Sequence, residues 1–153
     1  MISHRFAKPL VAAMLTMAAP IAFAAPAFAG DCPSGQEMAN ALTGHPTAPK
    51  DVTDTVIGAI DLGSEIGVDG RQLRTRRLVV QPGGIVPLHS HKDRPALIVT
   101  VSGQITEYRS TCAVGIVHHA GEISREAEGI SHWWRNEGNE PAVLLSSDVF
   151  HGK

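Results

Sequence analysis

The feature that most constrains the fold is a series of short segments rich in Val, Ile, Leu and Thr, separated by glycines, that fills the chain from Val52 onward. This region has no long stretch with the 3.6-residue spacing of an amphipathic helix. Regularly spaced short strands with turn residues between them are typical of all-β sandwiches and barrels. The expected strands are Thr53–Leu62, Gln72–Gln81, Ile85–Ser90, Ala96–Ser102, Gln104–Arg109, Ala113–His118, Glu122–Glu126, Ser131–Asn136 and Ala142–Val149.

The first 29 residues have the pattern of a secretory signal peptide. Two basic residues precede an apolar stretch over residues 10–25, and Ala27-Phe28-Ala29 supplies the small residues that signal peptidase prefers. The apolar stretch is short and contains a proline, which disfavours a membrane-spanning helix; an uncleaved anchor is the alternative. We expect cleavage near Ala29/Gly30, a periplasmic or secreted protein, and no membrane association after cleavage.

The expected mature chain is weakly acidic. Cleavage removes Arg5 and Lys8 from the 13 basic residues and none of the 15 acidic ones, which leaves 11 against 15 and a formal net charge of −4. The sequence has no basic run, so its charge does not indicate binding to nucleic acid or to an anionic membrane.

The chain has two cysteines, Cys32 and Cys112, and both remain after the expected cleavage. In an oxidising compartment a disulfide is favoured over two free thiols. Such a bond closes a loop of about 80 residues and, in the chain-entropy model, would stabilise the fold by about 4 kcal/mol. It would attach the N-terminal part of the chain to the β-rich part.

Residues 30–51 are expected to form an N-terminal arm ahead of a β domain over residues 52–153, a length that suits a single domain. Ser34-Gly35-Gln36-Glu37 has the form of a capping box, and a glycine at position 44 could end the helix that follows. The arm is therefore predicted to contain a short helix over Glu37–Leu42.

Two histidines one residue apart are the strongest sign of chemistry. His89 and His91 begin the stretch HSHKDRPALIVTVSG, and residues two apart in a strand point to the same side. Farther along, Gly121 opens a second stretch, GEISREAEGISHWWRN, which contains His132. Three imidazoles are enough to bind a transition metal, although histidines in a polar core without a metal are the alternative.

Together these stretches resemble the two sequence motifs of the cupin superfamily. The first motif has a glycine, five residues, H-x-H, a glutamate and a final glycine, and its matching positions here are Gly83, His89, His91 and Gly103. The second has glycines, a proline, a histidine and an asparagine, and it is matched by Gly121, Gly129, His132 and Asn136, with Ala127 in place of the proline. The resemblance covers about 54 residues, Gly83 to Asn136.

The resemblance implies a single jelly-roll β-barrel that holds a divalent transition metal through His89, His91 and His132. The metal would be iron, zinc, copper, nickel or manganese. The glutamate that usually completes the cupin site is replaced by Ala96, which cannot bind a metal. Three protein ligands leave open positions for water or substrate. Asp93 and Glu126 are the candidates for an additional ligand.

Four residues are candidates for the pocket around the metal: Arg94, Ala96, Arg125 and Trp134. Arg94 and Arg125 could each bind an anionic substrate through two parallel hydrogen bonds, or form ordinary surface ion pairs. If Trp134 and His132 lie in one strand, their side chains point to the same face of it. Trp134 would then either form a wall of the pocket or pack in the core.

The expected function is that of an exported single-domain cupin, a metal-dependent, dioxygenase-like oxidoreductase acting on a small organic substrate. The alternative is a non-catalytic periplasmic cupin that binds or senses a small molecule. The family resemblance also implies a homodimer. The absence of G-x-S-x-G and of a phosphate-binding glycine motif argues against serine hydrolase and nucleotide chemistry.

Overall fold

A computed structural model describes residues 30–151. Within these residues, eight strands and one short helix follow one another. Their bounds are β1 (Lys50–Asp61), α1 (Leu62–Ile66), β2 (Arg71–Ser90), β3 (Ala96–Ser102), β4 (Gln104–Arg109), β5 (Ile116–His119), β6 (Ile123–Glu126), β7 (Ser131–Arg135) and β8 (Ala142–His151).

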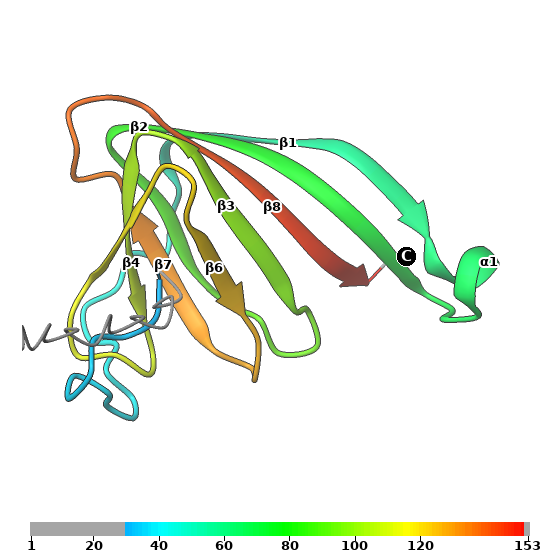
Figure 1. The fold of residues 1–153 in the computed structure, drawn as a ribbon, viewed down its shortest axis with the longest axis horizontal. Coiled ribbons are helices and arrows are strands. Elements are labelled where there is room, and N and C mark those ends of the chain that lie inside the picture. The colour runs from blue at the N-terminus through cyan, green and yellow to red at the C-terminus, as the bar shows by residue number, and fades with distance from the viewer. Residues whose placement is uncertain (1–29, 152–153) are drawn as a thin grey trace, which may run out of the picture.

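The strands form one antiparallel sheet that curls into a nearly closed barrel (Figure 1). The order across the sheet is β5-β4-β7-β2-β8-β3-β6, and β1 pairs with β2 outside this path. β5 and β6 lie at opposite ends of this order but are consecutive in sequence, with only three residues between them. The turn between them also bonds to β3, because Thr100 N–H donates to the Glu122 carbonyl over 3.0 Å. These connections bring the two edges of the sheet together, and the all-β jelly-roll prediction is confirmed.

The predicted strands are found with small changes in their bounds. β3 and β4 have the predicted limits, whereas Gln72–Gln81 and Ile85–Ser90 are parts of one long strand, β2. Gly83, with a φ of 73°, and Gly84 lie at the junction of these two parts. A Cβ at Gly84 would lie 2.8 Å from the Asp51 carbonyl oxygen, so glycine lets β1 approach β2 closely here.

The predicted helix over Glu37–Leu42 is wrong. The backbone of this part of the arm pairs with the loop after β4: Glu37 forms a β-bridge with Cys112, and Ala41 N–H donates to the Ser110 carbonyl over 3.0 Å. Backbone groups that bond across to another segment cannot form the bonds of a helix. The helix of this structure is α1, capped by the Asp61 side chain, which accepts from two backbone N–H groups.

The predicted disulfide is confirmed. Cys32 and Cys112 are bonded, with 5.6 Å between their Cα atoms and a sequence separation of 80. The bond joins the arm to the loop after β4, at the place where the arm backbone also pairs with that loop.

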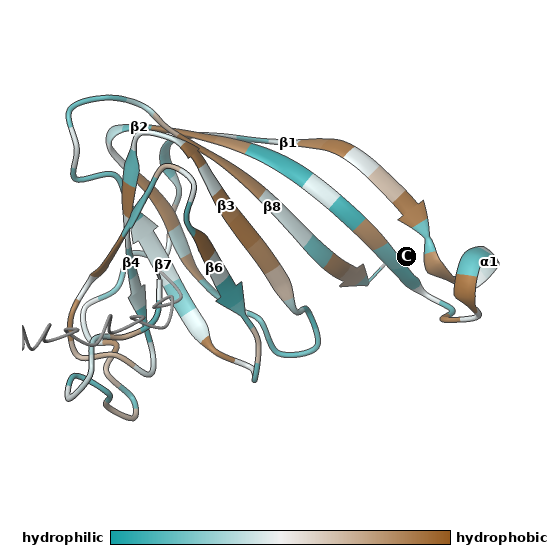
Figure 2. Ribbon diagram, viewed as in Figure 1, coloured by the Kyte–Doolittle hydropathy of each residue, from teal (hydrophilic) through white to brown (hydrophobic). Residues whose placement is uncertain are grey.

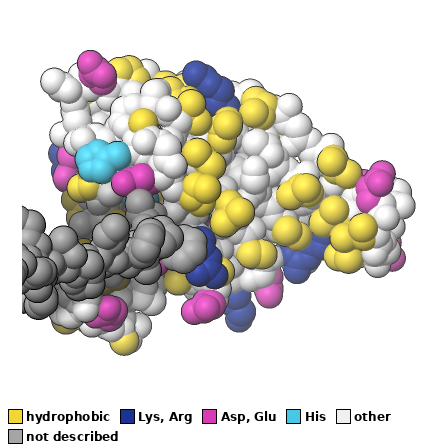
Figure 3. Space-filling model, in the orientation of Figure 1, with side chains coloured by type: hydrophobic (Ala, Val, Ile, Leu, Met, Phe, Trp, Pro, Cys, Tyr) yellow, Lys and Arg dark blue, Asp and Glu magenta, His cyan; other side chains and the backbone are white. Residues whose placement is uncertain are grey.

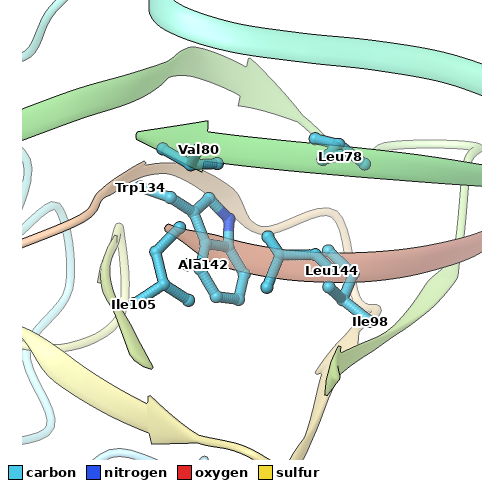
Figure 4. Close-up of a cluster of buried hydrophobic side chains, with 7 residues drawn as sticks. All are labelled: Leu78, Val80, Ile98, Ile105, Trp134, Ala142 and Leu144. Carbon is cyan, nitrogen blue, oxygen red and sulfur yellow. The ribbon is translucent and has the colours of Figure 1, made fainter. Parts of the chain in front are cut away.

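The hydrophobic core lies between strands that are far apart in sequence. Figure 4 shows its seven buried side chains, which come from β2, β3, β4, β7 and β8: Leu78, Val80, Ile98, Ile105, Trp134, Ala142 and Leu144. Along β8 buried and partly buried residues alternate, as expected for a strand with one face in the core.

Hydrophobic side chains are also exposed on the hairpin of β1, α1 and the start of β2. Figures 2 and 3 show them near α1, and the exposed residues of this region include Val56, Ile57, Ile60, Ile66 and Val68. Among residues 30–151, no helix is long and apolar enough to cross a membrane.

Candidate metal centre

Three histidines from two paired strands meet inside the barrel. His89 on β2 lies directly opposite His132 on β7, and His91 follows immediately after the end of β2. The Nε2 atom of His89 lies 3.2 Å from that of His91 and 3.0 Å from that of His132. His91 and His132 are buried and His89 is half-buried. The structure therefore brings together the three histidines that the sequence predicted as ligands.

The other ring nitrogen of each histidine faces a hydrogen-bond acceptor. His89 Nδ1 lies 2.9 Å from the Pro87 carbonyl and His91 Nδ1 lies 2.8 Å from the Arg94 carbonyl. His132 Nδ1 lies 2.6 Å from a carboxylate oxygen of Glu107. Because these acceptors need a proton on Nδ1, each neutral imidazole presents an unprotonated Nε2 to the other two. Three converging lone pairs are the arrangement that a metal ion requires.

The charge state of these histidines also fits a metal. Burial, together with the neighbouring His132, lowers the pKa of His89 from 6.5 to about 4 and that of His91 to about 3. Both side chains are therefore neutral at physiological pH. Neutral imidazole is the form that binds zinc, copper, iron and nickel.

A buried network behind His132 centres on Glu107 of β4. The Glu107 carboxylate binds His132, accepts from His118 over 2.9 Å, and accepts from Arg109 Nε over 3.0 Å. Burial alone would raise the pKa of Glu107, but the hydrogen bonds from His118, His132 and Arg109 hold it well below its usual range. Glu107 is thus a buried anion that fixes the orientation of His132.

Sequence reasoning missed this network. Glu107 lies between the two motifs, and neither Glu107 nor His118 was among the predicted site residues, yet both are buried. A signal was present in the predicted strand Gln104–Arg109. Ile105, Glu107 and Arg109 alternate along it, so a buried isoleucine would place an acid and a base on the same inward face.

Neither candidate for an additional ligand faces the three Nε2 atoms. Asp93 is exposed in the turn after β2, where its backbone has a φ of 60° and its carbonyl accepts from Arg71. Glu126 is buried, but its carboxylate lies 3.2 Å from Nδ1 of His132, the nitrogen opposite the one that faces His89. Burial and the adjacent Glu107 raise the pKa of Glu126. Glu126 therefore belongs with Glu107, in a second group that could hold a cation with His132.

A cavity of about 270 Å³ opens beside His89. Of the predicted pocket residues, Arg94 and Trp134 line it. Arg125 is exposed and Ala96 is buried within the sheet, so neither belongs to the lining. The full lining is Asp54, Arg76, Leu78, Val86, Pro87, His89, Arg94, Ile98, Trp134, Leu144 and Ser146.

A buried carboxylate lies next to the position of the missing glutamate, but it is bound by arginines. Asp148 on β8 is the pairing partner of Ala96 on β3. It accepts two hydrogen bonds from Arg74, at 3.0 and 2.8 Å, and one from Arg94 at 2.9 Å. Burial would raise the pKa of Asp148, but Arg74 and the other arginines keep it below its usual value. Asp148 therefore organises these arginines beside the cavity.

Comparisons with known proteins agree with this fold. A protein-family profile described as "Cupin domain" matches residues 76–148. The Germin-like protein 8-14 of Oryza sativa subsp. japonica is 31% identical over 88 residues, which is 55% of this chain and 41% of that protein. The chain thus spans less than half the length of the curated relatives it matches first.

Solved structures with the same fold have low sequence identity. A conserved protein with a double-stranded β-helix domain from Klebsiella pneumoniae has a TM-score of 0.53 and 17% identity, covering 72% of this chain and 81% of that one. An oxalate oxidase in complex with the substrate analogue glycolate has a TM-score of 0.51 and 21% identity, and the match covers 70% of this chain and 55% of that one. The profile match and the barrel formed by these strands place residues 76–148 of this chain in the cupin superfamily.

Proposed function

We propose that this protein is an exported, metal-dependent cupin oxidoreductase that holds one divalent transition metal through His89, His91 and His132 and acts on a small organic substrate. The observation that supports it most is the convergence of three Nε2 atoms, since those of His91 and His132 lie within 3.2 Å of that of His89. Each belongs to a ring whose Nδ1 faces an acceptor. Without a cation between them, these lone pairs would repel one another.

A metal bound by three histidines supplies Lewis acidity or, if it is iron or copper, one-electron chemistry, at positions left open to a substrate. The protein supplies orientation and shielding. Glu107 holds His132 in one tautomer, and the carbonyls of Pro87 and Arg94 do the same for the other two rings. Trp134, which is 2% exposed, packs against His132 with 5.4 Å between ring centroids and restricts water on that side.

Export is part of the same proposal. The described residues contain no free cysteine, because Cys32 is bonded to Cys112. Disulfides persist in oxidising compartments such as the periplasm and the extracellular space. Together with the signal-peptide pattern of residues 1–29, which lie outside the described residues, this bond supports a periplasmic or secreted protein. Detection of a mature N-terminus at Gly30 by mass spectrometry would test it.

The proposed activity is tested by oxygen uptake. The purified protein is loaded with Fe²⁺ under argon, its metal content is measured, and oxygen consumption is recorded with a panel of small organic substrates. We expect substrate-dependent uptake that is lost in His132→Ala and retained in His119→Ala, which changes an exposed histidine outside the group. Fully loaded protein that consumes no oxygen with any substrate would contradict an oxidoreductase.

One observation favours the alternative of a non-catalytic binding protein. The carboxylate that lines the cavity, Asp54, is paired with Arg76. The lining residues therefore include no unpaired carboxylate that could act as a general base. Tight, saturable binding of a small molecule without turnover would establish this second function.

A further inference from the structure

The inward face of β2 and β8 changes from charged to apolar along the barrel. Residues on one face of a strand are two apart, and the pairing of these strands places Arg74 opposite Asp148 and Arg76 opposite Ser146. One layer farther, Leu78 is opposite Leu144. Figure 4 shows Leu78 and Leu144 on these strands with Trp134 and Ile98 nearby. The cavity touches both layers, because Arg76 and Ser146 line it together with Leu78 and Leu144.

The charged layer has an excess of positive charge. Three guanidinium groups, of Arg74, Arg76 and Arg94, face the two carboxylates of Asp54 and Asp148. The Arg74 and Arg94 contacts to Asp148 measure 2.8 and 2.9 Å, whereas Arg76 lies 3.9 Å from it. One positive charge is therefore left over beside the cavity.

Some N–H donors of these arginines have no acceptor within residues 30–151 and are available to a ligand. A guanidinium has five N–H donors, and Asp148 takes one of them from Arg94. Of the residues that the structure describes, Arg76 presents a buried Nε with no hydrogen-bond partner. A buried unsatisfied donor destabilises the protein unless a ligand or water binds it.

We propose that the cavity binds a small monocarboxylate with a hydrocarbon or aromatic body. Its carboxylate is held by Arg76 and Arg94 beside His89, and its body packs against the apolar lining residues Leu78, Val86, Ile98, Trp134 and Leu144. This inference rests on the proposed function and specifies its substrate class.

The lining distinguishes this class from other small molecules. A neutral ligand would leave the positive charge of the arginine layer uncompensated. A dicarboxylate would place its second charge against leucine, isoleucine and tryptophan side chains, where burying an unpaired charge is costly. The volume of about 270 Å³ lies just below the range of typical small-molecule sites, which suits an acid of modest size.

Calorimetric titration of Zn²⁺-loaded protein tests the inference with three probes of similar length. These are 3-phenylpropionate, its neutral amide 3-phenylpropionamide, and the dicarboxylate glutarate. We expect 3-phenylpropionate to bind more tightly than either of the others by about tenfold or more, because the amide has no charge for the arginine layer and glutarate has a second charge without a partner. Equal affinity for the acid and its amide would overturn the proposal.

Variants then locate the carboxylate. Arg94→Gln and Arg76→Gln should each weaken binding of 3-phenylpropionate by about tenfold or more while leaving binding of the amide unchanged. Arg125→Gln is the matched control, because Arg125 is exposed and outside the cavity. Equal affinities in all three variants would contradict the assignment. The acid–amide comparison on the wild-type protein keeps the test decisive if an arginine variant fails to fold.

Metal content is measured on every titrated sample, so the two proposals fail separately. Protein that takes up no metal contradicts the three-histidine centre, and the same titration on that metal-free protein still tests the arginine layer. Fully loaded protein that does not prefer the acid contradicts only the substrate class.

Discussion

Glu107 connects the three-histidine group to the rest of the barrel. It is fully buried, and its two oxygens contact His132, His118 and Arg109. A carboxylate behind a metal-binding histidine fixes the tautomer and raises the basicity of the ligating nitrogen. The metal affinity of His132 is therefore expected to depend on a residue that need not touch the metal.

Glu107→Gln should weaken metal binding by about 10- to 100-fold, because the amide removes the negative charge that faces His132 Nδ1. The variant also removes the nearer carboxylate from the buried Arg109 and leaves only Glu126 at 3.9 Å, so some loss of folding stability is expected. Competition with a chromogenic chelator measures the affinity. Glu65→Gln, on the exposed surface of α1, is the control, and equal affinity in both variants would refute this role.

The lowered pKa values of His89 and His91 predict a pH-dependent stability of the metal-free protein. Below pH 6.5 the unfolded chain binds protons on these rings, whereas the folded chain does not do so until about pH 4 or lower. The free energy of unfolding should therefore fall as the pH falls from 6.5 toward 4.5. Urea denaturation at several pH values in this range measures the free energy of unfolding. We expect this free energy to change less with pH in the double variant His89→Gln/His91→Gln than in the wild type. Parallel curves for the variant and the wild type would rule out these two histidines as the cause.

The sequence predicted the three histidines because their spacing lies within two local motifs. It did not predict Glu107, His118 or the position of Glu126, because each gains its role from partners on other strands. His118 and Glu107, for example, are brought together by the pairing of β4 with β5. Such contacts depend on the register of the sheet, which the sequence pattern alone leaves open.

At the level of the elements, Asn136 holds the bend of β2 against the loop that leads into β8. Its side-chain amide donates to the Val80 and Glu140 carbonyls, both over 2.8 Å, and its oxygen accepts from Gly138 N–H over 2.9 Å. Its backbone also bonds to Gly83 and Gly84. The second-motif asparagine therefore has a structural role in this chain.

Asn136→Ala should lower the free energy of unfolding by about 2–3 kcal/mol, because it removes three hydrogen bonds and leaves buried carbonyl groups with fewer partners. Denaturant unfolding of the metal-free protein measures it. Asn139→Ala changes an exposed asparagine in the same loop and should have little effect. Similar stability of the two variants would show that the contacts of Asn136 contribute nothing.

The strands were predictable because their composition and turn residues agree with the fold, as in β3 and β4. The prediction of a helix in the arm was wrong, because the local capping pattern at Ser34–Glu37 competes with pairing of the arm to the loop after β4. The bridge between Glu37 and Cys112 and the disulfide both favour that pairing. Tertiary contacts thus override a weak local preference.

At the scale of the whole molecule, the arm is attached to the barrel beside the network of Glu107. The disulfide fixes Cys32 to the loop after β4, and the carbonyl of Gly30 accepts from Arg109 over 3.3 Å. Arg109 in turn binds Glu107. The homodimer implied by the family stays a prediction, for which the exposed hydrophobic residues of β1 and α1 offer a surface.

Cys32→Ser/Cys112→Ser should lower the free energy of unfolding by up to about 4 kcal/mol, since the bond closes a loop of 80 residues. Urea denaturation with and without a reductant measures this. Reductant should destabilise the wild-type protein and leave the double variant unchanged. If the wild type and the double variant are equally stable under oxidising conditions, the bond does not stabilise the fold.

The most direct test of the central claim is the metal content of the protein, purified without a histidine tag or chelator and measured by elemental analysis. The three-histidine centre predicts about one equivalent of a divalent transition metal per chain, retained in His119→Ala and lost in His89→Ala/His91→Ala/His132→Ala. The account would be contradicted by wild-type protein that neither contains nor takes up a metal, or by a triple variant that keeps a full equivalent.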